Sequence, residues 1–378
     1  MLFYTMTTTE DAGLINTTRL VDRFLGYVVC DSESGNEKQF CELIERELSA
    51  LGLSVYRDEA GEKCGSNGWN IRASLPGTGD PILFCAHLDT VSPGRGIRPI
   101  VGEDGVIRSA GDTVLGSDDK SGVAAVIEAL AAIMDNKLPH RPIEVLFTVC
   151  EELGMLGSRH ADYSAIASKQ AVVLDSSKNG ALINRAPANM HIEVTVKGRA
   201  AHAGVAPEKG VHALKAAAAA VANIPCGRVD EETVMNVANL LAPGKTNVVP
   251  DTAAFQMEIR SFREELLQQR IEQARRALNE ACEQFGASYE MTLERHSDPL
   301  YVPEDSPLLL CLREAYRELG VEARVEGTFG GSDATWLSAN GISAVNIGTG
   351  MSAVHGVGEH IAIPDLILTS RVVLAMMQ

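Results

Sequence analysis

The chain is poor in aromatic residues and in positive charge, and it has no long hydrophobic run. Phe, Tyr and Trp make up 5% of its 378 residues, which suits helices packed on a sheet better than an aromatic-rich β-sandwich. Lys and Arg number 33 against 50 Asp and Glu, giving a formal net charge of −17. Such a protein repels nucleic acid and anionic membranes, and no apolar stretch reaches the roughly 18–20 residues of a membrane span. We therefore expect neither partner.

Paired cysteines are also lacking. The eight cysteines are scattered without a C-x-x-C pair, and several lie in apolar runs such as VLFTVC, where Cys behaves as a small hydrophobe. A disulfide framework is unusual in a domain of this size, which favours a reducing compartment. The opening MLFYTMTTTEDAG has neither the basic segment nor the sustained apolar core of a secretory signal. These features predict a cytoplasmic protein.

From Ile71 onward, short apolar runs alternate with helical patterns. The runs are NIRASL, PILFCAHL, EVLFTVC and AVVLD, and the helical patterns cover 122–134 and 156–167. This order predicts an α/β domain whose sheet is mainly parallel, with helices on both faces. Two amphipathic helices are expected before it, at 17–29 and 36–51, and GEDGVIRSAG predicts a hairpin.

Beyond residue 188 the pattern changes to that of a second, smaller domain. MHIEVTVKG alternates with period two, and an Ala-rich helix (211–224), two strands, a long charged helix (264–286) and the strand ASYEMTLERH follow it. The order β-α-β-β-α-β is that of a ferredoxin-like α+β unit. We therefore predict an inserted lid domain at 189–296, within a catalytic domain made of 1–188 and 297–378.

Polar residues follow three of the predicted strands directly. His87 and Asp89 come after PILFCA, Glu151 and Glu152 after EVLFTVC, and Asp175 ends AVVLD. In open α/β sheets, ligands bind beyond the carboxyl ends of the strands. Capped strand ends or an acidic first helical turn could explain some of them. Two carboxylates at the end of a buried strand are costly, however, unless a cation lies beside them.

Two further candidates lie outside the strand ends. Asp118, followed by Asp119, precedes a helix in GSDDKSG, and His355 lies in the Gly-rich loop GTGMSAVHGVGEH. Adjacent carboxylates at a helix start often only cap the helix, and one histidine is a weak signal. Taken with the strand-end residues, however, they provide the imidazoles and carboxylates that suit two zinc ions sharing one carboxylate.

Nine motifs occur along the chain in a fixed order: HLDTV, GSDDKSG, EELG, VLDSS, GRAAHAG, TNVVPD, EIRS, GGSDA and VHG. From about Leu14 to its end, the chain thereby resembles the co-catalytic zinc hydrolases that include peptidase T, aminoacylase and glutamate carboxypeptidase. The spacing and the DSESGNEK opening look most like the peptidase T-like branch. The resemblance implies an exopeptidase, tripeptidase- or aminopeptidase-like, that hydrolyses short peptides with a zinc-activated water.

The resemblance also implies roles for the strand-end and loop residues. One zinc would be held by His87, Asp118 and Asp175. The second would be held by Asp118, Glu152 and His355, so that Asp118 bridges. Glu151 would act as general base and Asp89 would orient His87. A cis peptide between Asp118 and Asp119 is implied as well, and Co²⁺ or Mn²⁺ could replace zinc.

Three lid residues complete the implied site. His202, in GRAAHAG, would stabilise the oxyanion, while Asn247 and Arg260 would meet the substrate carboxylate. By sequence alone, an Arg on a lid strand can equally be a solvated surface residue. The oligomeric state stays open, with a homodimer through the lid as one expectation.

Three other functions compete with the exopeptidase. An N-acyl-amino-acid deacylase would use the same site, and the motifs barely separate the two activities. An aminopeptidase from a related two-zinc clan would lack this lid, so the inserted segment with His202 argues against it. A non-catalytic metal-dependent binding protein is the most remote alternative, because fold does not fix function but a pure binder has no need of Glu151.

Overall fold

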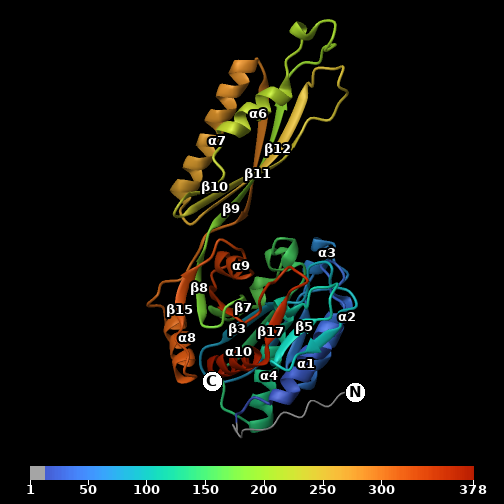
Figure 1. The fold of residues 1–378 in the computed structure, drawn as a ribbon. Coiled ribbons are helices and arrows are strands. Elements are labelled where there is room, and N and C mark those ends of the chain that lie inside the picture. The colour runs from blue at the N-terminus through green and yellow to red at the C-terminus, as the bar shows by residue number, and fades with distance from the viewer. Residues whose placement is uncertain (1–12) are drawn as a thin grey trace. The chain divides into compact units, whose positions relative to one another are not determined.

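The computed structural model describes residues 13–378; the first twelve, where a secretory signal was sought, lie outside the described residues. The chain forms two compact units. Unit 1 contains the chain up to Asn184 together with Val302–Glu326 and Ser332–Gln378. Unit 2 contains Arg185–Tyr301 and the short segment Gly327–Gly331. The insertion predicted at 189–296 therefore lies within unit 2 (Figure 1).

A mixed sheet forms the centre of unit 1. Its strands are, in spatial order, β1 (Ser54–Arg57), β2 (Ile71–Leu75), β6 (Ile143–Thr148), β3 (Ile82–His87), β7 (Gln170–Ser176), β16 (Ser343–Gly348) and β8 (Ala181–Ala186), with the short strands β14 (Leu300–Tyr301) and β15 (Arg324–Gly327) beside β8. The four middle strands, β6, β3, β7 and β16, run parallel. Every residue of β3 and β6 is buried, as expected where both faces are covered.

Helices cover both faces of this sheet, as predicted. The helices of unit 1 are α1 (Thr17–Val29), α2 (Lys38–Ala50), α3 (Ala60–Cys64), α4 (Ser117–Asn136), α5 (Leu156–Arg159), α8 (Pro307–Glu318), α9 (Ala334–Ala339) and α10 (Ile363–Met377). Helix α4 packs against β3 and β7, whereas α9 packs against β7 and β16 from the opposite face (Figure 1). The predicted α/β class is confirmed.

The helix predicted at 156–167 is wrong. Only Leu156–Arg159 is α-helical, and a separate 3₁₀ turn, Tyr163–Ala165, follows it. The break lies at Asp162, which is extended (φ −83°, ψ 90°) and accepts a hydrogen bond from Ser164 N–H. Asp side chains compete with helical hydrogen bonding in this way, and the apolar periodicity did not reveal the competition.

The predicted hairpin forms and gains a third strand. β4 (Pro99–Val101) pairs with β5 (Val106–Ser109), and the turn contains Gly105 at φ 72°, an angle that favours glycine. β5 also pairs with β17 (His360–Ala362). This small sheet fixes the C-terminal end of the loop that carries His355.

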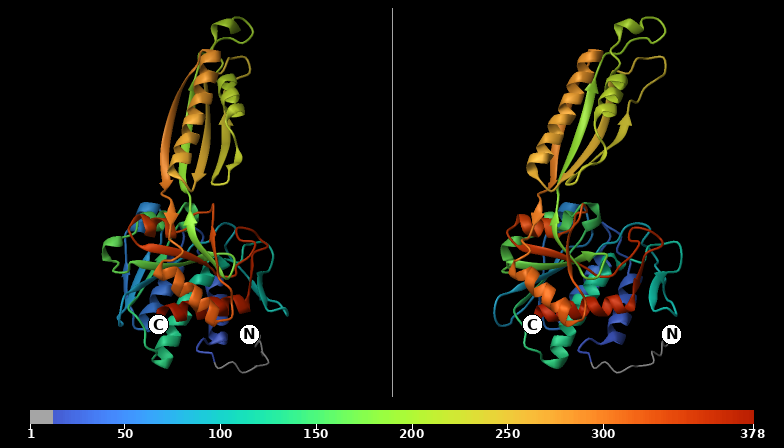
Figure 2. Two further views of the ribbon diagram at one scale, coloured as in Figure 1. Left: turned by 90° about the vertical axis from the view of Figure 1, so that its left-hand side faces the viewer. Right: turned by 60° about the vertical axis from the view of Figure 1, so that its left-hand side comes forward.

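Unit 2 is an antiparallel sheet with two helices on one face (Figure 2). Its strands are, in spatial order, β10 (Gly227–Asp230), β11 (Thr233–Leu241), β12 (Thr252–Ser261), β9 (Ala188–Lys197) and β13 (Ser288–Ser297), and its helices are α6 (Ala213–Asn223) and α7 (Glu264–Phe285). Strands β9, β11, β12 and β13 with the two helices make the predicted ferredoxin-like unit. β10 is an additional edge strand that the sequence pattern did not predict.

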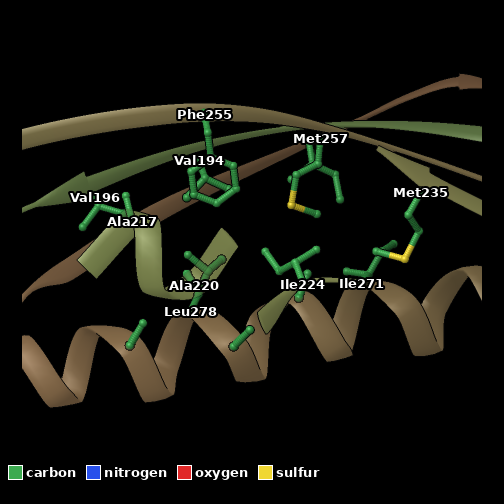
Figure 3. Packing of buried hydrophobic residues seen from close by; sticks show 14 of the residues in the cluster. Val194, Val196, Ala217, Ala220, Ile224, Met235, Phe255, Met257, Ile271 and Leu278 are labelled. Atoms are coloured by element: carbon green, nitrogen blue, oxygen red, sulfur yellow. The ribbon is translucent and has the colours of Figure 1, made fainter. Parts of the chain in front are cut away.

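The period-two pattern of β9 and β12 separates an apolar face from a polar face. Val194, Phe255 and Met257 point at α6 and α7, where they meet Ile271 and Leu278 (Figure 3). Fully burying such side chains contributes about 1.5–3 kcal/mol each. The intervening residues, Glu258 and Arg260 among them, therefore lie on the opposite, polar face of the sheet.

No helix within residues 13–378 is long and apolar enough to cross a membrane. All eight cysteines are free thiols.

Candidate metal centre

His87 is the last residue of β3, and its imidazole is buried at the carboxyl end of the parallel strands. Nδ1 lies 2.9 Å from the backbone oxygen of Asp89 and 3.5 Å from that residue's Oδ1. The backbone carbonyl is thus the closer orienting group, where the sequence suggested the carboxylate. Because Nδ1 donates to this carbonyl, Nε2 is the nitrogen available to bind a cation.

Asp118 lies between two imidazoles. It is the second residue of α4 but has non-helical angles, and the peptide that joins it to Asp119 is cis, as the resemblance implied. Its Oδ1 is 3.0 Å from Nε2 of His87, and its Oδ2 is 3.3 Å from Nε2 of His355. One carboxylate therefore presents a separate oxygen to each imidazole, as a bridging ligand requires.

Asp119 has a different task. Its Oδ1 accepts from Gly122 N–H at 3.1 Å, and its Oδ2 accepts from His87 N–H at 3.2 Å. It therefore caps the continuing part of α4 and fixes the end of β3.

Glu152 and His355 meet from opposite ends of the sequence. Glu152 belongs to the 3₁₀ turn Glu151–Leu153 after β6, and His355 lies in the loop between β16 and β17. His355 Nε2 is 3.0 Å from Glu152 Oε1. This buried oxygen nevertheless has no hydrogen-bond partner among the described residues, so the contact lacks hydrogen-bond geometry. A buried, unpaired carboxylate oxygen calls for another partner.

Asp175 comes from the end of β7 and is aimed by the neighbouring strand β16. Asp175 N–H donates to Asn346 Oδ1 at 2.9 Å, and Asn346 Nδ2 donates back to Asp175 O at 2.7 Å. The Asp175 carboxylate then lies 4.0 Å from His87 Nε2. All five predicted ligands thus come together in two groups, His87–Asp118–Asp175 and Asp118–Glu152–His355, each with its ligand atoms within 4.8 Å of one another.

Asp89 positions the turn that carries both glutamates. Its Oδ1 accepts from Glu151 N–H at 2.9 Å and its Oδ2 from Glu152 N–H at 3.2 Å. Ser34, in the DSESGNEK segment, donates to the same carboxylate at 2.7 Å. Asp89 therefore connects His87 with the turn that bears Glu151, a wider task than the sequence suggested for it.

A second buried acid holds the residue that precedes the Glu151–Leu153 turn. Glu37, also in DSESGNEK, accepts from Cys150 N–H at 3.1 Å and from the Cys150 thiol at 3.3 Å. Cys150 has φ 53°, an angle that is strained for a non-glycine residue. The sequence pattern does not predict these contacts, although the charged Glu37 beside an apolar helix start is a signal that could have pointed to them.

The electrostatics of the site indicate a deficit of positive charge. Burial raises the pKa of Glu151 and of Asp175 well above the usual range, and it raises the pKa of Glu152 to about 7. Asp118 differs, because hydrogen bonds from His355 and His87 outweigh its burial and lower its pKa. The bond to Asp118 in turn raises the pKa of His355 to about 9.

Two divalent cations fit this deficit. The unpaired Glu152 Oε1 and the raised carboxyl pKa values both report missing positive charge next to the two ligand groups. Imidazole nitrogen and carboxylate oxygen are donors that Zn²⁺ accepts, and Co²⁺ and Mn²⁺ accept them as well.

His202 and Asn247 lie side by side in unit 2. His202 forms a β-bridge with Val248, and Ala203 N–H donates to Asn247 O at 2.9 Å. Gly204 N–H donates to His202 Nδ1 at 3.2 Å, so the neutral ring carries its proton on Nε2. Both side chains are exposed, and His202 Nε2–H is available as a donor.

Arg260 is on β12, and Glu258 from the same strand holds its guanidinium. Nε and one terminal nitrogen donate to the two Glu258 oxygens at 2.7 and 3.2 Å, and the other terminal nitrogen donates to Phe329 O at 2.7 Å. Three of the five guanidinium N–H groups are thus engaged. One N–H on each terminal nitrogen has no acceptor among the described residues, so a carboxylate can still bind to this pair.

The fold and the site together define a class: an α/β metallohydrolase with an inserted α+β unit. The chain belongs to peptidase family M20/M25/M40, whose model matches residues 83–378.

Individual relatives cover nearly the whole chain. The uncharacterized protein YqjE of Bacillus subtilis is 33% identical over 368 residues, which is 97% of this chain and 99% of its own. Aminopeptidase PepT of Bacillus cereus has a TM-score of 0.90 at 32% identity, covering 97% of this chain and 99% of its own. A tripeptidase of Staphylococcus aureus has a TM-score of 0.93 at 31% identity, covering 97% and 98%. The resemblance to the peptidase T-like branch is thereby confirmed.

Proposed function

We propose that the protein is a two-metal exopeptidase that hydrolyses short peptides, tripeptides among them. The observation that carries this proposal is the pair of ligand groups sharing Asp118, with Glu151 beside them. The likeness to an aminopeptidase and to a tripeptidase, each above 30% identity over almost the full length, supports the substrate class. We propose zinc as the native metal because of the imidazole and carboxylate donors.

The cations would be held by His87, Asp118 and Asp175 on one side and by Asp118, Glu152 and His355 on the other. When bound, two such cations polarise the scissile carbonyl and make a water molecule more acidic. The remaining steps fall to side chains of the protein.

Glu151 is suited to act as general base and then as general acid. A carboxylate oxygen of Glu151 lies within 4.8 Å of ligand atoms of His87 and Glu152, which places it beside the position where a water would be activated. The Asp89 bond to its backbone N–H fixes the base of the side chain. Glu151 would take the proton of the attacking water and return it to the leaving amine.

We propose that three residues of unit 2 bind the tetrahedral oxyanion and the terminal carboxylate of the substrate. His202 would donate its Nε2–H to the tetrahedral oxyanion, a contact typically worth about 2.7–4 kcal/mol. Arg260 would bind the substrate carboxylate through its two remaining N–H groups, with Asn247 as a further donor. These roles rest on the resemblance and on the donors that the local geometry leaves available.

A substrate panel tests the proposal. Zinc-loaded protein should release single amino acids from di- and tripeptides, and mass spectrometry of the products identifies the end that is cleaved. Cleavage of N-acetyl amino acids in preference to every peptide would instead establish a deacylase. Hydrolysis of neither class by fully metal-loaded protein would refute a catalytic role.

We further propose a homodimer formed through unit 2. Within the described part of the chain, β13 pairs only with β9, so its outer edge is open. An open antiparallel edge can pair with the same edge of a second copy about a two-fold axis. Sedimentation equilibrium at a mass near 40.4 kDa would show a monomer and refute the proposed dimer.

A further inference from the structure

The carboxylate of Glu359 accepts four hydrogen bonds inside unit 1. Its Oε2 accepts from the N–H groups of Leu115 and Gly116, both at 2.8 Å. Its Oε1 accepts from Ser117 Oγ at 2.6 Å and from Asp118 N–H at 3.0 Å. The residue is 1% exposed. A carboxylate has about four acceptor sites, so this one is saturated.

These bonds replace the missing cap of α4. The residue at its N-cap is Gly116, with φ 74° and no side chain to accept a hydrogen bond. Helix N-termini leave unpaired N–H groups and favour negative charge. Glu359 supplies both the acceptors and the charge from 241 residues away in the sequence.

The same residue forms the base of the His355 loop. Ser352 and His360 close this loop through two backbone hydrogen bonds of 2.9 and 3.0 Å, and Glu359 N–H donates to Gly356 O at 3.0 Å. The His355 side chain is 55% exposed, and its Nε2 contacts Asp118 and Glu152. Because the imidazole is carried on this loop, the position of the loop's base contributes to where it lies.

We propose that Glu359 is a positioning residue that holds the backbone of Asp118 and the His355 loop at a fixed distance from each other. It thereby sets the affinity of the Asp118–Glu152–His355 group for its cation. This inference rests on the metal centre proposed above. The first group depends on Glu359 less, because His87 and Asp175 are held on their strands by Asp89 and Asn346. Loss of Glu359 should therefore weaken the Asp118–Glu152–His355 group selectively.

Glu359→Gln is the informative substitution. Its NH₂ group would turn toward Ser117, whose hydroxyl can accept, and the bond from Asp118 N–H would be lost because both groups share Oε1. Outer residues that orient metal ligands typically change metal affinity by about 10- to 100-fold. A role limited to capping α4 would lower stability while leaving the relative affinities of the two groups unchanged.

Glu128→Gln provides the matched control. Glu128 is on the same helix and fully buried, and it pairs with Arg19 and Arg23 instead of the metal centre. Apo forms of wild type and both variants would be titrated with Zn²⁺ by calorimetry, with bound metal counted by mass spectrometry and Tm measured in parallel. We expect the Glu128 variant to lose stability but to bind both ions as wild type does.

For Glu359→Gln we expect one ion at wild-type affinity and the second weakened at least about 10-fold. Two ions at wild-type affinity, or equal weakening of both, would overturn the inference. If this variant does not fold, Ser117→Ala removes one of the four bonds and should show the same selective loss at smaller size; unchanged binding would overturn the inference. Wild type that binds fewer than two ions would instead refute the proposed metal centre, whatever Glu359 does.

Discussion

Glu258 accepts two side-on hydrogen bonds from the guanidinium of Arg260, with Nε 2.7 Å from one carboxylate oxygen and a terminal nitrogen 3.2 Å from the other. The hydrogen bond and charge of Arg260 oppose the burial of Glu258 and lower its pKa. The pair fixes the plane of the guanidinium in advance, so a substrate carboxylate would meet an oriented donor and not a free side chain.

Arg260→Ala should therefore weaken hydrolysis of peptides with a free C-terminus. A hydrogen bond to a charged group is worth about 1.5–3 kcal/mol, or roughly 10- to 150-fold in kcat/KM. Amidating the peptide should cost the wild type a similar factor but scarcely affect the variant, because one contact cannot be lost twice.

Arg263→Ala is the control for this experiment. Its side chain is 57% exposed and reaches Glu232 and Glu265 only at 3.9 and 3.6 Å, so kcat/KM should stay within about twofold. Fully additive penalties of amidation and Arg260→Ala would exclude Arg260 as the carboxylate-binding residue.

Glu151→Gln should leave two metal ions bound and remove most of the hydrolysis. The side chain keeps its shape but loses the ability to accept a proton, at a cost on the order of 10²–10⁴-fold in kcat. Steady-state kinetics with metal analysis of the same sample would check this. Retention of more than half of the activity would show that another group is the base, and loss of metal would make Glu151 a ligand.

His202→Ala should lower kcat by about 100- to 1,000-fold with unchanged metal content, because an oxyanion donor acts mainly in the transition state. His212→Ala, in the same unit, is the matched control: His212 caps α6 by accepting from Lys215 N–H. That variant should lose a little stability and keep its kcat. Loss of zinc from the His202 variant would instead show that His202 is a metal ligand.

Metal-free protein should become less stable as the pH rises from about 5 to 9. Glu152 has a pKa of about 7 in the folded state against 4.5 ordinarily, and His355 has about 9 against 6.5. Both pKa values are raised on folding, so the folded chain binds more protons than the unfolded chain in this window. The stability that these groups contribute at low pH is therefore lost as they deprotonate.

Zinc should reverse this trend, because cation binding requires deprotonated ligands and strengthens as the pH rises. Thermal melts at pH 5, 7 and 9, with chelator or with excess zinc, would give diverging Tm curves. Parallel curves would mean that the ligand groups do not bind the added metal.

The sequence was most informative for candidate ligands that lie at or just beyond the end of a buried strand. His87 and Asp175 lie at the ends of β3 and β7, and Glu152 lies in the turn that follows β6. Parallel strands bring their carboxyl ends to one edge of the sheet. The supporting contacts could not be predicted in this way. Asn346 meets Asp175 from 171 residues away, and no local pattern encodes a contact of that kind.

The errors in the predicted secondary structure have local causes. The helix predicted at 156–167 ends because Asp162 begins a new turn, although the apolar spacing continues through it. β8 and β10 were not predicted. β10 is four residues long, with none of them buried, so it lacks the apolar alternation by which a strand is recognised.

The chain enters and leaves unit 2 through two paired strands. Ala186 of β8 pairs with Leu300 of β14, and Arg185 pairs with Tyr301. The two ends of segment 185–301 are therefore neighbours. If the segment were removed, a short turn could join the flanking strands of unit 1 without distorting them. Chain segments whose ends meet in this way tolerate exchange as complete modules. A module from a relative could be joined at this point, exchanging the proposed substrate-binding residues of unit 2 while the proposed metal ligands keep their own scaffold.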